Sequence, residues 1–162
     1  MNFGDEINTP YATSRGRDWP SVRQFNVFLE NRVGGLLNVV RRFEQTDVRI
    51  ISLIVNDLTD CAIIRLVLSD PERGLEILKL ANLPVTESDL LVVELPENPQ
   101  PLAVICKCLL AAEINIDYAY HLVFGMPMRT ALALHVDNHE MSVNTLTQQG
   151  FTVFTENDLT QG

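Results

Sequence analysis

A short loop at residues 31–36 combines residue types that bind small charged molecules. Its sequence is Asn31-Arg32-Val33-Gly34-Gly35-Leu36, and a pattern typical of an amphipathic helix follows it directly. The start of a helix offers unpaired backbone N–H groups and the positive end of a dipole, which together favour a carboxylate. Glycine allows a ligand to approach the backbone closely, and an asparagine amide binds either an ammonium or a carboxylate. From the residues alone, a tight turn between a strand and a helix is the simpler interpretation.

Three further side chains outside this loop could contact a ligand. Tyr118 and Tyr120 are two positions apart in a strand-like segment, so both point to one face of the sheet. There they could line a pocket between two units and supply hydroxyl groups, or simply pack at an interface. Arg65 interrupts the apolar segment 61–68 and could bind a ligand carboxylate. Pairing with a structural aspartate is the favoured interpretation of Arg65.

The cysteines and histidines do not form a metal-binding pattern. Cys106 and Cys108 are two apart on an expected helix, so they face different directions and are expected in the core. His135 and His139 have no cysteine near them in the sequence. The chain also lacks a phosphate-binding glycine loop, a nucleophile elbow and a His-Glu-x-x-His motif. We therefore expect no metal, no cofactor, no catalytic residues and no enzyme activity.

Composition and charge narrow the possible partners and the compartment. The 162 residues are 46% hydrophobic and carry a formal net charge of −9, which opposes binding to nucleic acid. No apolar run approaches the roughly 20 residues of a membrane-spanning helix, and the first twenty residues lack the apolar region of a signal peptide. Three cysteines are an odd number, which suits reduced thiols. The sequence therefore predicts a cytoplasmic protein that binds neither nucleic acid nor membrane.

Two similar phrases indicate that the chain contains an internal repeat. Thr86-Glu87-Ser88-Asp89-Leu90 resembles Thr155-Glu156-Asn157-Asp158-Leu159. A shift of about 70 positions also aligns four more pairs of similar residues, and both halves show the same succession of periodicities. These pairs are Leu36 with Leu102, Asp47 with Glu113, Val48 with Ile114, and Ile50 with Ile116. The sequence therefore predicts a duplicated unit.

The same order of elements is expected in both halves. The first half predicts a strand, a helix, a hairpin of two strands, a helix that opens at Ser69-Asp70-Pro71-Glu72, and a short strand near Val85. The first strand is expected at 22–29, the first helix at 34–46, and the two hairpin strands at 48–55 and 61–68. The second half predicts elements at 90–95, 101–112, 115–123, 129–136, 138–149 and 151–154. We expect an N-terminal tail or arm at 1–21, a first module at 22–88 and a second module at 89–162.

This order predicts an α+β protein made of two ferredoxin-like βαββαβ modules in tandem. Right-handed crossovers place both helices of a module on one face of its antiparallel four-stranded sheet. The other face is then uncovered and needs a neighbour. We therefore expect the two modules to pack through their sheets, and a homodimer to cover the apolar surface that remains.

The loop at 31–36 also resembles a family signature. Asn31, Gly34 and Leu36 match the ACT-domain pattern Asp/Asn-x-Pro-Gly-x-Leu, whereas Val33 departs from it. In the second half, Glu97-Asn98-Pro99-Gln100-Pro101-Leu102 keeps the proline and the leucine but has glutamine in place of glycine, so this copy looks functionally impaired. Arg65 with Ser69-Asp70-Pro71, and the segment 114–120, are similar to phrases in stand-alone tandem ACT proteins. The resemblance covers residues 22–159.

The resemblance implies a non-catalytic regulatory protein that binds a small molecule, expected to be an amino acid, at the interface between modules near the first loop. The ligand would favour one arrangement of the modules and so change association with a target enzyme or regulator. A ligand-free protein-interaction module is the main alternative. A small acylphosphatase-like enzyme ranks last, because Arg32 only loosely mimics its phosphate-loop arginine and the hairpin has no matching asparagine. The ligand contacts implied are Asn31, Arg32, Val33, Gly34, Gly35, Leu36, Tyr118 and Tyr120.

Overall fold

The computed structural model describes residues 18–160, so most of the predicted N-terminal arm lies outside the described part. The strands and helices follow the predicted order, except that two predicted strands are merged into one and the last predicted strand is reduced to a bridge. Additional helical turns follow the first helix and residue 155. The elements are β1 (Val22–Glu30), α1 (Gly35–Val40), the 3-10 helix η1 (Arg41–Phe43), β2 (Ile50–Asp57), β3 (Cys61–Leu68), α2 (Pro71–Leu80), β4 (Val85–Glu94), α3 (Pro101–Ala111), β5 (Ile116–Phe124), β6 (Arg129–Val136), α4 (His139–Gln148) and α5 (Glu156–Thr160).

The strands form one six-stranded antiparallel sheet in the order β2-β3-β1-β4-β6-β5, not two four-stranded sheets as predicted. The expected short strand near Val85 and the expected strand at 90–95 are a single strand, β4. Its first half pairs with β1, from Val85 opposite Val27 to Leu90 opposite Val22, and its second half pairs with β6. No glycine or proline interrupts Val85–Glu94, so the strand continues without a break from the first module into the second.

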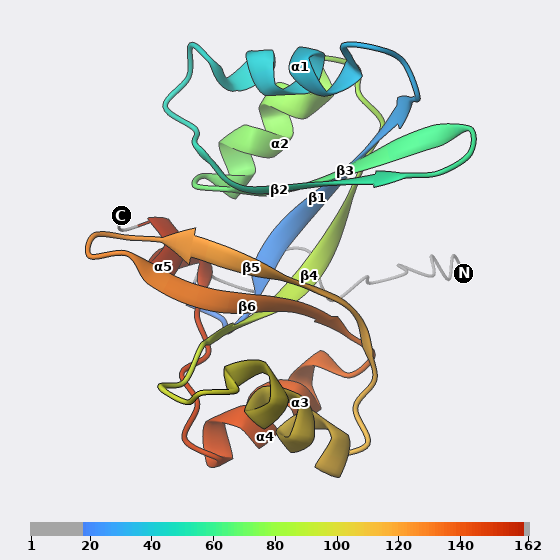
Figure 1. Ribbon diagram of the computed structural model, residues 1–162. Coiled ribbons are helices and arrows are strands. Elements are labelled where there is room, and N and C mark those ends of the chain that lie inside the picture. The colour runs from blue at the N-terminus through green and yellow to red at the C-terminus, as the bar shows by residue number, and fades with distance from the viewer. Residues whose placement is uncertain (1–17, 161–162) are drawn as a thin grey trace, which may run out of the picture.

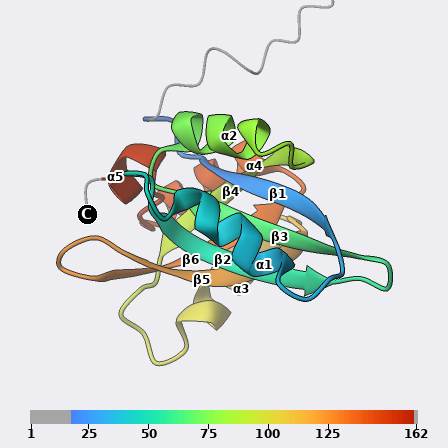
Figure 2. The same ribbon diagram turned by 90° about the horizontal axis from the view of Figure 1, so that it is seen from above.

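The shared strand lets the two halves of the sheet face each other. In Figure 1, α1 and α2 lie above β1, β2 and β3, whereas α3 and α4 lie below β5 and β6. The view from above in Figure 2 shows α1 and α2 in front of the strands. Separate buried clusters lie under each pair of helices, and a third joins the facing halves of the sheet. The predicted packing of sheet face against sheet face is therefore confirmed.

The duplication is visible in a matching irregularity of the two edge strands. The pairing register shifts between Ile50 and Ser52 in β2, and between Ile116 and Tyr118 in β5, which are equivalent positions in the two repeats. A β-bulge turns the following side chains to the opposite face of the sheet. Ile116 accordingly packs under α3 and α4, while Tyr118 packs in the cluster between the modules.

The end of the chain departs from the expected repeat. The strand expected at 151–154 is reduced to a bridge between Val153 and Val93, and residues 156–160 form α5. Thr155 donates through its backbone N and its hydroxyl to the Asp158 carboxylate, 2.8 and 3.0 Å away, which stabilises the start of a helix. The similar phrase at 86–90 pairs with β1 instead. Tertiary context thus decides between strand and helix for the same motif.

The helix ends follow local chemistry that the sequence displays. Asp70 caps α2 by accepting from Arg73 N at 3.1 Å, and Pro71 occupies the first turn, as predicted. The helix expected at 34–46 is shorter, because α1 gives way to the 3-10 helix η1 at Arg41. None of the helices in residues 18–160 has the length and apolar character needed to span a membrane.

Candidate functional site

A partly buried polar cluster lies between the facing halves of the sheet and joins the two modules. We call it the interface cluster and define it as Gln24, Asn26, Arg65, Tyr118 and Tyr120. The first three project from β1 and β3 of the first module, and the tyrosines project from β5 of the second. Both tyrosines pack against the apolar cluster between the modules, so they share one face, as their spacing predicts.

Gln24 is the centre of this cluster and is fully buried. Its Nε2 donates to Asn26 Oδ1 at 2.7 Å and to Tyr118 Oη at 2.8 Å, and its Oε1 accepts from Tyr120 Oη at 2.7 Å. Both amide hydrogens are therefore used. A buried amide is tolerated when its hydrogen bonds are made and is costly when they are not. These bonds thus favour one placement of the second module on the first.

The two tyrosines have different surroundings. The ring of Tyr118 stacks on His135, with centroids 5.0 Å apart and planes 8° apart, and the Arg65 guanidinium carbon lies 4.0 Å from its centroid. His135 Nδ1 is 2.8 Å from Asp117 Oδ2. Burial, and secondarily the proximity of Tyr118, raise the pKa of Tyr120 above its ordinary value, although the Arg65 charge opposes this shift. Tyr120 is therefore a neutral hydrogen-bond donor at physiological pH.

Arg65 does not pair with a structural aspartate, so that prediction is wrong. Its Nη1 donates to Asn56 Oδ1 at 2.8 Å, and its Nε is buried without a hydrogen-bond partner. Asn56 lies on β2, the strand that pairs with β3. The charge of Arg65 is therefore not balanced by any carboxylate of the described residues.

The first loop lies at the outer end of β1 and is exposed. Gly34 has a φ of 87°, a conformation that favours glycine, and the space around its Cα is open. No side chain caps α1. Asn31 Nδ2 donates to Asp57 Oδ1 at 2.9 Å, which ties the loop to the β2–β3 hairpin, and Arg32 pairs with Glu30. Val33 is fully exposed and Leu36 is 41% exposed, so neither contributes much to the core.

The structure does not bring the two predicted groups of site residues together. Asn31 follows Gln24 by seven positions along an extended strand, a separation of roughly 23 Å at 3.3 Å per residue. No hydrogen bond or ring contact joins Tyr118 or Tyr120 to residues 31–36. One small molecule cannot contact both groups within a single chain.

The second loop is arranged differently from the first. Gln100 precedes α3 and its backbone N donates to Asn98 Oδ1 at 2.9 Å, while Pro101 has no N–H to donate. A hollow next to this loop is lined by Glu94, Leu95, Pro96, Glu97, Gly150, Phe151 and Thr152. The charged side chains that line it, Glu94 and Glu97, are both acidic. Arg129 lies beside the hollow and binds Glu94. This hollow therefore does not attract a carboxylate.

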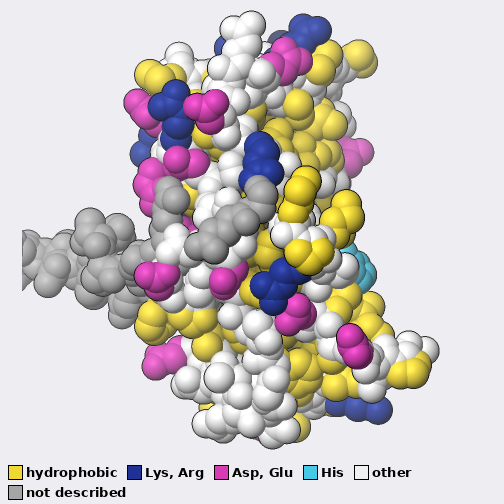
Figure 3. Space-filling view, turned by 90° about the vertical axis from the view of Figure 1, so that its left-hand side faces the viewer, with side chains coloured by type: hydrophobic (Ala, Val, Ile, Leu, Met, Phe, Trp, Pro, Cys, Tyr) yellow, Lys and Arg dark blue, Asp and Glu magenta, His cyan; other side chains and the backbone are white. Residues whose placement is uncertain are grey.

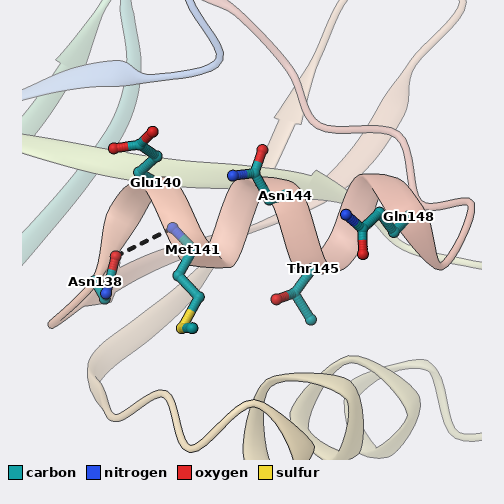
Figure 4. Close-up of a pocket in the computed structure, with 6 residues that line it drawn as sticks. All are labelled: Asn138, Glu140, Met141, Asn144, Thr145 and Gln148. Atoms are coloured by element: carbon teal, nitrogen blue, oxygen red, sulfur yellow. Dashed lines mark hydrogen bonds between the residues drawn. The ribbon is translucent and has the colours of Figure 1, made fainter.

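A second hollow runs along α4 and is shown in Figure 4. Its lining consists of side chains from that helix and its cap, including Glu140, Met141 and Gln148. Asn138 Oδ1 accepts from Met141 N at 3.1 Å, so this amide acts as the helix cap. The hollow offers no positive charge, and it lies outside the interface between the modules.

Sequence analysis missed Gln24 and Asn26. The signal that could have found them is the spacing of two amides at alternate positions of an apolar strand, which places both on the face left uncovered by helices. Two buried amides on the face that contacts the second module indicate a polar contact there.

The fold and the interface cluster define two α/β modules that share strand β4 and pack face to face, with the helices on the outside. The family model for the ACT domain pair matches residues 20–161, and the chain belongs to this family. No curated protein matches the chain.

Several solved structures share the fold. Protein BT0572 from Bacteroides thetaiotaomicron has a TM-score of 0.78 at 23% identity, covering 88% of this chain and 97% of that one. The regulatory subunit of aspartate kinase from Thermus thermophilus has a TM-score of 0.53 at 13% identity, covering 79% and 91%. The structure of aspartokinase alpha and beta subunits has a TM-score of 0.51 at 14% identity, covering 82% and 93%. At these identities the likeness shows the fold alone.

Proposed function

We propose that this chain is a non-catalytic regulatory protein of the cytoplasm that binds a small molecule, an amino acid or a similar compound, at the interface between its modules. The interface cluster is the observation that carries this proposal. The contact between the modules includes an apolar cluster, yet it also contains a guanidinium without a carboxylate partner and two tyrosine hydroxyls bound to one buried amide. Polar groups of this kind are suited to a ligand that acts on both modules.

Regulation follows if the ligand binds one arrangement of the modules more tightly than another. The modules share β4 and the interface cluster, so a small change at Tyr118 or Arg65 acts directly on the contact between them. A differential affinity of 1–3 kcal/mol is typical of such coupling. A shift of this size is enough to change association with a target enzyme or regulator.

The first loop remains a second proposed contact region, with Asn31, Arg32, Val33, Gly34, Gly35 and Leu36. Its support is the uncapped start of α1 beside an exposed asparagine amide. The loop is far from the interface cluster of its own chain, so its contribution would be separate. The second loop is proposed to be impaired. The backbone N–H of Gln100 already donates to Asn98, and Pro101 has no N–H, so neither residue offers a free donor at the start of α3.

Substitutions in the two loops test this asymmetry. Gly34→Gln is expected to reduce an amino-acid-dependent rise in melting temperature, whereas Gln100→Ala is expected to leave it unchanged. The unliganded melting temperature of Gly34→Gln should also fall, because a positive φ costs about 1 kcal/mol for most L-residues. Each variant is therefore compared with its own unliganded melt by differential scanning fluorimetry. The opposite pattern would place the contact in the second loop.

A homodimer is also part of the proposal. Large hydrophobic side chains are exposed on both modules, and Figure 3 shows such side chains at the surface of the upper and lower halves of the molecule. Analytical ultracentrifugation at micromolar concentration should give about twice the 18.2 kDa mass of one chain. Sedimentation as a single 18.2 kDa species would contradict this part of the proposal. Among residues 18–160, the exposed large hydrophobic residues are Trp19, Val33, Leu36, Leu37, Val55, Leu58, Leu80, Leu102, Leu110, Val123, Met126, Met128 and Met141.

The same exposed side chains favour a second candidate function, a protein-interaction module that needs no ligand. Apolar surface of this kind is typical of protein-binding sites. A ligand screen separates the two candidates, because an interaction module gives no response to any small molecule. An acylphosphatase-like activity has less support, since Arg32 is exposed and pairs with Glu30.

A further inference from the structure

Arg65 contacts no acidic side chain, in contrast to several other arginines of the described residues. Its guanidinium lies between the modules with one buried nitrogen, Nε, that has no partner, and its polar contact is the neutral amide of Asn56. A partly buried charge without a counterion is unfavourable, and a guanidinium presents five N–H donors. By contrast, Arg23 binds Glu156, Arg32 binds Glu30 and Arg129 binds Glu94.

Tyr118 supplies a second donor close to the same guanidinium. Its hydroxyl oxygen accepts from Gln24 Nε2, so the hydroxyl hydrogen itself is not used in that bond. No acceptor for this hydrogen is found among residues 18–160. Tyr120 differs, because its hydroxyl donates to Gln24 Oε1. Since the Arg65 guanidinium lies over the Tyr118 ring, the cation and the unused hydroxyl hydrogen belong to one small region.

The chemistry of this region favours an anion with a single charge. The Asp117 carboxylate binds His135, whose ring stacks on Tyr118, and it does not pair with Arg65. A planar guanidinium binds a carboxylate through parallel hydrogen bonds, and one guanidinium balances one negative charge. In a chain with 21 acidic and 12 basic residues, such an unneutralised cation stands out as a place for an anion.

We infer that Arg65 and Tyr118 form the binding point for the carboxylate of the small ligand. This inference rests on the proposed function, since it names the group through which the ligand contacts both modules. The Arg65 guanidinium would bind the carboxylate from the first module, and the Tyr118 hydroxyl would donate to it from the second. Ligand binding would then strengthen the contact between the modules beside the Arg65 guanidinium, which has no carboxylate partner.

The test compares ligand affinity in matched variants by isothermal titration calorimetry. The probes are the amino acid that most stabilises the wild type among the twenty, its carboxamide, acetate and inorganic phosphate. The variants are Arg65→Gln, which removes the charge, and Tyr118→Phe, which removes only the hydroxyl. Arg42→Gln is the control, because Arg42 also donates to one asparagine, Asn38, but is exposed on η1.

The amino acid should bind Arg65→Gln at least tenfold more weakly than wild type, and Tyr118→Phe several-fold more weakly, as expected for lost hydrogen bonds to a charged group. Arg42→Gln should bind as wild type does, and the carboxamide should bind poorly. Equal affinity in Arg65→Gln, or equal binding of the carboxamide, would overturn the inference and leave the regulatory function standing. Phosphate binding that exceeds amino-acid binding and needs Arg65 would overturn the carboxylate assignment. No response to any of the twenty amino acids would overturn both.

Discussion

Replacing Gln24 with leucine is expected to lower the free energy of unfolding by about 3 kcal/mol. Leucine fills a similar volume but leaves Tyr118, Tyr120 and Asn26 without their hydrogen bonds to the amide. Each buried polar group that loses its partner costs about 1–3 kcal/mol. Tyr120 is affected directly, because its hydroxyl donates to Gln24 Oε1. Urea unfolding followed by tryptophan fluorescence or circular dichroism measures the change.

Two controls separate the hydrogen bonds from simple volume effects. Gln148→Leu, on the exposed side of α4, should change stability by less than about 0.5 kcal/mol. Adding Tyr120→Phe to Gln24→Leu should cost less than the sum of the single changes, because the second change removes a group that the first left unpartnered. Strict additivity would show that the hydrogen bond between these two side chains contributes nothing to the contact between the modules.

Replacing Arg23 with methionine is expected to cost about 3 kcal/mol as well. Glu156 is 6% exposed, and it accepts from Arg23 Nε at 2.7 Å and from the Arg23 backbone N at 3.0 Å. The hydrogen bond to Glu156, more than the one to Glu72, raises the pKa of Arg23, and burial opposes this shift. Without the guanidinium, a buried carboxylate stays without its cation, which is strongly destabilising.

The exposed pair Arg32–Glu30 provides the matched control for that experiment. Both side chains are largely in solvent, so Arg32→Met should change the free energy of unfolding by less than about 1 kcal/mol. Equal effects of Arg23→Met and Arg32→Met would contradict the role of Glu156 as a buried anchor. Since Glu156 begins α5 and Arg23 lies on β1, this ion pair joins α5 to the first module.

The order of strands and helices was predictable because each has a local signal in the sequence. Apolar periodicity marked the elements, and Asp70 with Pro71 marked the start of α2. The merging of two expected strands into β4 was not predicted, because local patterns do not show which strands share a partner. The motif at 155–159 became a helix for a similar reason, since only β1 holds its counterpart at 86–90 in a strand.

The direction of the two tyrosine side chains was predictable, and their hydrogen-bond partners were not. The spacing of Tyr118 and Tyr120 gave their common face, but the hydrogen bonds from these tyrosines to Gln24 could not be derived, because they join residues 94 and 96 positions apart. The same limit explains Arg65, for which an aspartate was expected and an asparagine was found. Long-range polar contacts depend on how the modules pack, which the sequence does not display locally.

The most direct test of the central claim is a thermal-shift screen of the wild-type protein against the twenty amino acids. A ligand at about 100 times its dissociation constant stabilises a folded protein by roughly 2.7 kcal/mol, which gives a clear rise in melting temperature. We expect at least one amino acid to produce this rise in the wild type and a smaller rise in Arg65→Gln. A flat response to all twenty would contradict an amino-acid-sensing function and favour the interaction module.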